Sequence, residues 1–73
     1  MKRNELWEKL KEEQIPEDAY SLYGGLPNEK FCINKSQYWE VYYSERGLKK
    51  QLNRFNTEDE ACECLYNMLH GIF

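Results

Sequence analysis

The stretch QYWEVYYSERG, residues 37–47, constrains the fold of this chain more than any other part of the sequence. Its alternation of side chains predicts a β-strand with two distinct faces. Trp39 and Val41 are expected to face the core, because they are buried more readily than Glu40 is. A shift of one residue in strand pairing would exchange the two faces. With the expected register, the face away from the core carries Tyr38, Glu40, Tyr42 and Ser44.

The segments around this strand predict a helix, further strands and a second helix. Asn4 is a favourable N-cap for a first helix, which ends before Pro16. Residues 29–35 and 48–55 are predicted strands, the latter at an edge of the sheet, and residues 20–22 are either a short strand or a lead-in. A final helix begins at Thr57, which forms a capping-box pattern with Glu60. Both helices have one apolar side.

This order of elements predicts an α+β fold in one domain, residues 1–73. We expect a two-layer arrangement, in which an antiparallel sheet of three to four strands carries the N- and C-terminal helices on one face. Trp39 and Leu65 should then be buried together. A chain of 73 residues is long enough for one core only.

The residues that could carry chemistry are few. Cys62 and Cys64 lie two residues apart on a predicted helix and point about 200° apart, so they cannot share a metal ion. Cys32 and the single histidine, His70, do not add a pair with the usual ligand spacing. One histidine near the chain end gives little support to a nucleophile–base arrangement, and no phosphate-binding loop is present. We therefore expect no metal, no cofactor and no catalytic activity.

Charge narrows the range of partners. The net charge is −3, which disfavours general binding to nucleic acid and favours a basic protein partner. The first residues, MKRNELWEKLKEE, lack the apolar run of a signal peptide. No segment approaches the roughly 18 apolar residues of a membrane span. We expect a cytoplasmic protein that does not associate with membranes.

Protein binding is the function class that these exclusions leave. Tyrosines are favoured in interfaces, and a carboxylate between two rings can meet a cation of the partner. The predicted contact residues are Tyr38, Glu40, Tyr42, Glu45 and Arg46. The alternative is that the tyrosines only cover their own sheet. In that case the interface is expected at the acidic start of the last helix, residues 58–60.

Several segments together resemble a known group of proteins. The series YSLYGG, NEKFCI, WEVYYSERG and TEDEACECLYNML runs from about Tyr20 to Leu69. It is similar to small bacterial immunity proteins that are encoded beside polymorphic or contact-dependent toxins. The resemblance implies that the chain binds and neutralises a cognate toxin domain, many of which are nucleases with basic clefts.

Two other functions remain open. One is a small scaffold or subunit, including a homodimer that forms through the same sheet face. The other is RNA binding, because the order of helix, three strands and helix also occurs in double-stranded RNA-binding domains. Those domains carry lysines at the start of the last helix, where this chain has Glu58, Asp59 and Glu60. RNA binding is therefore the least favoured of the three.

Overall fold

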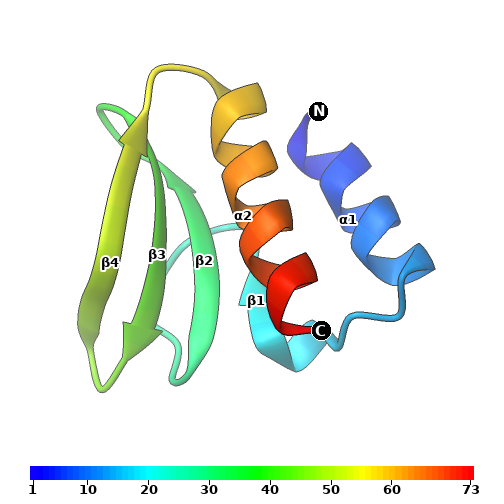
Figure 1. Cartoon of the computed structure of the whole chain (residues 1–73). Coiled ribbons are helices and arrows are strands. Elements are labelled where there is room, and N and C mark those ends of the chain that lie inside the picture. The colour runs from blue at the N-terminus through cyan, green and yellow to red at the C-terminus, as the bar shows by residue number, and fades with distance from the viewer.

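The structure is a computed structural model that describes the whole chain, residues 1–73. It confirms the α+β class and the helix–strands–helix order (Figure 1). In chain order the elements are α1 (Arg3–Glu12), the 3-10 helix η1 (Glu17–Ala19), β1 (Tyr20–Ser21), β2 (Lys30–Lys35), β3 (Trp39–Glu45), β4 (Leu48–Phe55) and α2 (Glu58–Ile72).

The four strands form one mixed sheet in the order β1-β2-β3-β4. The pairs β2–β3 and β3–β4 are antiparallel, as predicted, and Ile33 lies opposite Val41. β1 pairs in parallel with β2. The chain must therefore cross from the end of β1 back to the opposite end of the strands before it enters β2. Residues 22–29 make this crossing connection, and in Figure 1 it runs behind β2.

Both helices lie on one side of the sheet, with α2 along the strands and α1 beside α2 (Figure 1). The two helices and the sheet enclose one core. Trp39 and Leu65 belong to the same buried cluster, which confirms the predicted facing of the central strand. Burial of each such leucine contributes roughly 1.5–3 kcal/mol relative to an exposed one. The cluster contains Leu6, Leu10, Ile15, Tyr20, Leu22, Ile33, Trp39, Val41, Ala61, Cys62, Leu65 and Leu69.

The two helices begin in different ways. The Thr57 hydroxyl accepts a hydrogen bond of 3.2 Å from the Glu60 amide and donates one of 3.0 Å to the Glu60 carboxylate, so the predicted start of α2 is confirmed. The predicted N-cap of α1, Asn4, is wrong, because the helix begins at Arg3 with Lys2 as its N-cap. The reason is the Glu5 carboxylate, which accepts the Lys2 amide at 2.9 Å and so satisfies the helix start earlier in the chain.

Candidate functional site

The sheet face that was predicted to be open is covered at its centre. Tyr42 is fully buried, and its hydroxyl donates a hydrogen bond of 2.7 Å to the carbonyl oxygen of Gly25. Gly25 belongs to the connection between β1 and β2, which passes over this face. The prediction that Tyr42 is an exposed contact residue is therefore wrong. The crossing connection was not predicted, because the parallel pairing of β1 that requires it was not predicted either.

Glu40 is the second predicted contact residue that the structure withdraws from the surface. Only 8% of it is exposed, and its carboxylate lies between two cations of β4. The Lys49 ammonium is 3.2 Å from Oε1, and the Arg54 guanidinium is 3.7 Å from Oε2. The two cations compensate the cost of removing the carboxylate from water. Glu40 is therefore a partner of β4 within the sheet, and its prediction as an exposed site residue is wrong.

The other three predicted residues remain at the surface but do not lie together. Tyr38 precedes β3 and is 46% exposed. Glu45 and Arg46 lie at the opposite end of β3, about 20 Å away at the usual rise of a strand. The Glu45 carboxylate is 2.8 Å from the Lys50 ammonium, and the Arg46 amide donates to Asn28 Oδ1 at 3.2 Å. The role of Tyr38, Glu45 and Arg46 in partner binding stays a prediction, but these three residues do not form one surface.

Tyr38 contributes to a hollow beside the start of α2. This hollow has a volume of about 340 Å³, and Phe55 is its other apolar residue. The remaining lining comes from Arg54, Asn56 and Glu60, so its wall is mainly polar.

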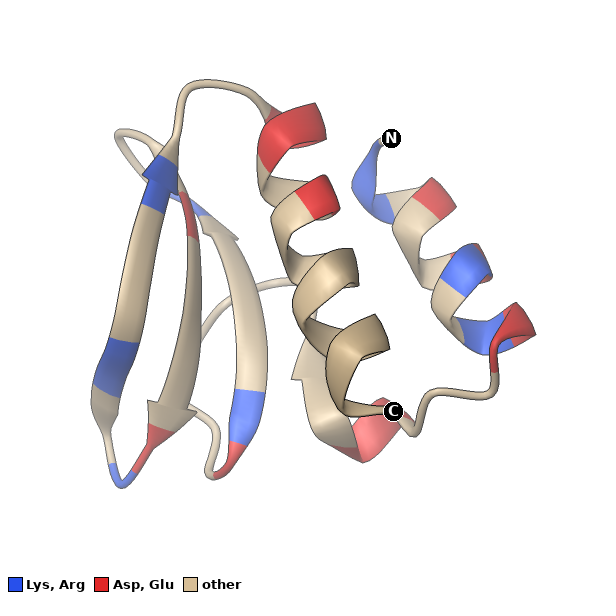
Figure 2. Cartoon of the chain, in the orientation of Figure 1, with Lys and Arg blue, Asp and Glu red and all other residues tan.

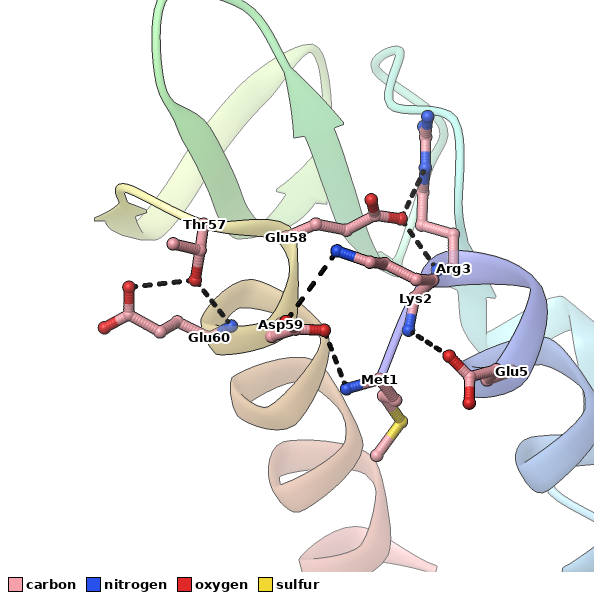
Figure 3. A network of polar contacts seen from close by, with 8 residues as sticks. All are labelled: Met1, Lys2, Arg3, Glu5, Thr57, Glu58, Asp59 and Glu60. Carbon is pink, nitrogen blue, oxygen red and sulfur yellow. Dashed lines mark hydrogen bonds and ion pairs between the residues drawn. The ribbon is translucent and has the colours of Figure 1, made fainter.

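The acidic start of α2, the second surface considered from the sequence, is occupied by the first residues of the chain (Figure 3). The Asp59 carboxylate lies 2.9 Å from the Met1 amino group and 3.7 Å from the Lys2 ammonium. The Glu58 carboxylate accepts the Arg3 amide at 2.8 Å. We call this set of contacts the N-terminal clamp. It uses Glu58 and Asp59 within the molecule, so these two carboxylates are not free to meet a partner.

A different surface carries two exposed aromatic side chains that lie together. Trp7 on α1 is 41% exposed, and Tyr23, which follows β1, is 78% exposed. Both line one hollow of about 200 Å³, together with Leu22, Arg3 and Asn4. In the sequence, Leu6 and Leu10 lie four residues apart and mark the apolar side of this helix, and Trp7 follows Leu6 directly. A turn of about 100° per residue separates Trp7 from Leu6, and this angle is the sequence signal that Trp7 flanks the apolar side.

Arg3 fixes the geometry of this hollow. Its guanidinium lies 4.7 Å from the centre of the Tyr23 ring and 5.0 Å from that of Trp39. It also donates a hydrogen bond of 3.2 Å to the Leu22 carbonyl, and its Nε is 3.8 Å from the Glu58 carboxylate. These contacts connect the N-terminal clamp to the loop that bears Tyr23. Arg3 therefore joins α1 to the loop that bears Tyr23, through the Leu22 carbonyl and the Tyr23 ring.

The other side of Trp7 borders a second, more polar hollow. It has a volume of about 430 Å³ and is lined by Trp7, Glu8, Lys11 and Glu12. The Lys11 ammonium lies 4.2 Å from the centre of the Trp7 ring. Glu8 and Glu12 form none of the ion pairs in the structure. The Trp7 side chain therefore separates two hollows. One contains Tyr23, and the other contains the carboxylates of Glu8 and Glu12, which form no ion pair.

Charge is distributed unevenly between the two layers of the molecule. Ten of the thirteen Asp and Glu residues lie outside residues 22–55, whereas six of the ten Lys and Arg residues lie within them. Figure 2 shows acidic residues at the start of α2, both acidic and basic residues on α1, and basic residues on β4. Trp7 lies beside Glu8 and Glu12 on the helical side, whereas the Tyr23 hollow is lined by Arg3 and by no carboxylate. This polarity gives the molecule an orientation in the field of a charged partner.

One cluster of titratable side chains joins the ends of the two helices. The Glu13 carboxylate accepts a hydrogen bond from the Tyr66 hydroxyl and lies 3.1 Å from His70 Nδ1. The hydrogen bond from Tyr66 lowers the pKa of Glu13, and His70 acts in the same direction. None of these three residues lines a hollow of the structure. The cluster connects α1 to α2.

The cysteines lie in or beside the core. Cys32 and Cys62 are buried, Cys64 is partly buried, and all three are free thiols. Burial raises the pKa of the Cys62 thiol to about 11, and the nearby Glu58 carboxylate adds to this effect. The structure contains no group of three or more His, Cys, Asp and Glu side chains that could hold a metal ion.

Neither helix has both the length and the apolar character needed to cross a membrane. Comparison of the chain with protein-family models, curated proteins and solved structures finds no match.

Proposed function

We propose that this chain is a non-catalytic protein-binding domain of the immunity type, which binds a bacterial toxin domain in the cytoplasm and neutralises it. The observation that carries this proposal is the pair of exposed aromatic residues, Trp7 and Tyr23, around one hollow. Tryptophan, tyrosine and arginine are the residue types most enriched among the residues that dominate binding energies. All three meet here, since Arg3 lies against the Tyr23 ring.

Two further features support an inhibitor. Arg3 holds the Tyr23 loop against α1, so little conformational entropy is lost when a partner binds. The acidic net charge would steer a basic toxin domain toward this chain and accelerate association. The resemblance of residues 20–69 to immunity proteins agrees with both features.

A homodimeric adaptor is the second candidate, and the free edge of β4 favours it. Leu48 and Leu52 are 62% and 39% exposed on this strand. Against it, Gln51 adopts a φ of 55° at an irregularity in the pairing with β3. Such a bulge, together with the lysines of the strand, opposes the pairing of one edge with another. We therefore prefer binding to a different protein.

The test is protection of cells. The toxin domain encoded beside the gene for this chain would be expressed from an inducible promoter, with and without this chain. We expect growth to be arrested by the toxin alone and restored by this chain, but not when the toxin is replaced by one from an unrelated locus. Growth that stays arrested while the chain is folded and abundant would refute the proposal, as would a locus that encodes no toxin.

A further inference from the structure

We infer that the surface around Trp7 binds a protein segment in which a large apolar side chain is flanked by lysine or arginine. This inference deepens the proposed function and rests on its claim that the chain binds protein. We call the surface the Trp7 surface, and it consists of Arg3, Trp7, Glu8, Lys11, Glu12 and Tyr23. The sequence did not indicate it, since the resemblance to immunity proteins leaves out α1.

The apolar part of the partner would enter the hollow between Trp7 and Tyr23. This hollow has room for one side chain, and three of its five lining residues are apolar or aromatic. Trp7 is the only one of the two tryptophans that is accessible, since Trp39 is 8% exposed against 41% for Trp7. An apolar side chain placed there would cover the exposed part of the indole and remove both surfaces from water.

The charged part of the partner would meet the outer side of α1. Glu8 and Glu12 lie four residues apart, line the same hollow as Trp7 and have no cation as an ion-pair partner. Lys11 also lines that hollow, and its ammonium lies over the Trp7 ring. Lys9 lines a further hollow with Glu8 and Glu12, and its ammonium is 5.0 Å from the centre of the Tyr66 ring, so it forms an ion pair with neither carboxylate. A lysine or arginine of the partner would therefore complement two unpaired carboxylates.

A second copy of this chain fits the Trp7 surface less well. Its basic side is β4, where Lys49 and Arg54 pair with Glu40, and Lys50 pairs with Glu45. If the helical side of one copy contacted β4 of the next copy, the first copy would still expose its β4 and the last copy would still expose its helical side. Such a head-to-tail contact grows into filaments unless the ring closes. Sedimentation of the purified chain over a range of concentrations would reveal this assembly.

The probe is a library of random peptides displayed on phage and selected on the immobilised full-length chain. We expect the selected peptides to combine an aromatic or large aliphatic residue with adjacent lysines or arginines. A synthetic copy of the best peptide should bind the Trp7→Ala chain at least about 30-fold more weakly. Glu8→Lys with Glu12→Lys should weaken binding at least about tenfold, and less so at high salt.

Matched controls separate this surface from the rest of the molecule. Phe73→Ala removes a different exposed aromatic residue, and Glu63→Lys reverses an exposed carboxylate on α2 that forms no ion pair. Both should leave peptide affinity within about threefold. In the nuclear magnetic resonance spectrum, the indole N–H signal of Trp7 should move on binding, whereas that of the buried Trp39 should stay.

Several results would overturn the inference. They are a selection without Trp7-dependent peptides, selected peptides that are acidic, and self-assembly that Trp7→Ala abolishes. None of them involves a toxin, so they leave the cell-protection test unaffected. Conversely, Trp7-dependent binding of basic peptides without protection of cells would retain this surface and remove the immunity function.

Discussion

The Tyr42 hydroxyl and the Gly25 carbonyl oxygen are joined by a hydrogen bond of 2.7 Å. This bond attaches the crossing connection to the middle of β3, where the Tyr42 ring is fully buried and the Lys49 ammonium lies 4.7 Å from its centre. The connection thereby covers the centre of the sheet face opposite the helices. This contact stabilises the fold, and the Tyr42 side chain is not available to a partner.

Substitution of Tyr42 should therefore change stability. Tyr42→Ala should lower the free energy of unfolding by about 3–5 kcal/mol, because a large buried ring is lost. Tyr42→Phe keeps the ring and removes the hydroxyl, so it should cost about 1 kcal/mol. Tyr38→Ala, at a side chain that is 46% exposed, serves as the control and should stay within about 0.5 kcal/mol. Urea denaturation measures all three, and a neutral Tyr42→Ala would contradict the burial of the Tyr42 ring.

Two glycines should respond in opposite ways to substitution by alanine. At Gly24, φ is +75° and an added Cβ would lie 2.5 Å from Asn34 Oδ1, so Gly24→Ala should destabilise the protein. At Gly71, within α2, an added Cβ would meet nothing within 4 Å. Gly71→Ala should therefore stabilise the protein by roughly 0.5–1 kcal/mol through helix propensity. Thermal midpoints measured in parallel would test the pair, and equal shifts would contradict the geometry at Gly24.

Stability should fall at alkaline pH. Burial raises the pKa of the Tyr42 hydroxyl to about 12 and that of the Cys62 thiol to about 11. Both groups are neutral in the folded protein at a pH where the unfolded chain already releases their protons, near 8.5 for cysteine and 10 for tyrosine. Their contribution is complete below these values and is lost as the pH rises through the folded values. Denaturation across this range should show the decline, and Cys62→Ala should make it smaller without removing it, because burial also raises the pKa of Cys32 and Cys64.

The N-terminal clamp should make the protein sensitive to acid. The hydrogen bond from the Met1 amino group, followed by the charge of Lys2, lowers the pKa of Asp59. Its contribution is therefore present above the unfolded pKa of about 3.9 and is lost as the pH falls through the lower folded value. Asp59→Asn should lower the thermal midpoint near pH 7, and the difference from the unaltered chain should shrink in strong acid. Glu63→Gln is the control and should have no such effect.

The sequence predicted the elements whose pattern is local. The alternation of Trp39 and Val41 identified the core face of β3, and Thr57 with Glu60 identified the start of α2. These signals depend on neighbours within a few residues, so one sequence is sufficient to read them.

The covered face of the sheet could not be read in the same way. The burial of Tyr42 depends on a parallel pair formed by a strand of two residues and on a connection without periodicity. The Trp7 surface depends on the contact of α1 with a loop about 15 residues later, which no local pattern encodes. Both the loss of the predicted site and the appearance of a new one are therefore consequences of tertiary packing.

The central claim is that the partner binds the Trp7 surface and not the outer face of the strands. Titration calorimetry with a purified toxin domain against which this chain protects cells tests it most directly, with Trp7→Ala compared with Tyr38→Ala. We predict that Trp7→Ala loses at least about 30-fold in affinity while its thermal midpoint stays close to that of the unaltered chain. Tyr38→Ala should bind within about threefold. Normal binding by Trp7→Ala together with loss of binding by Tyr38→Ala would contradict the claim.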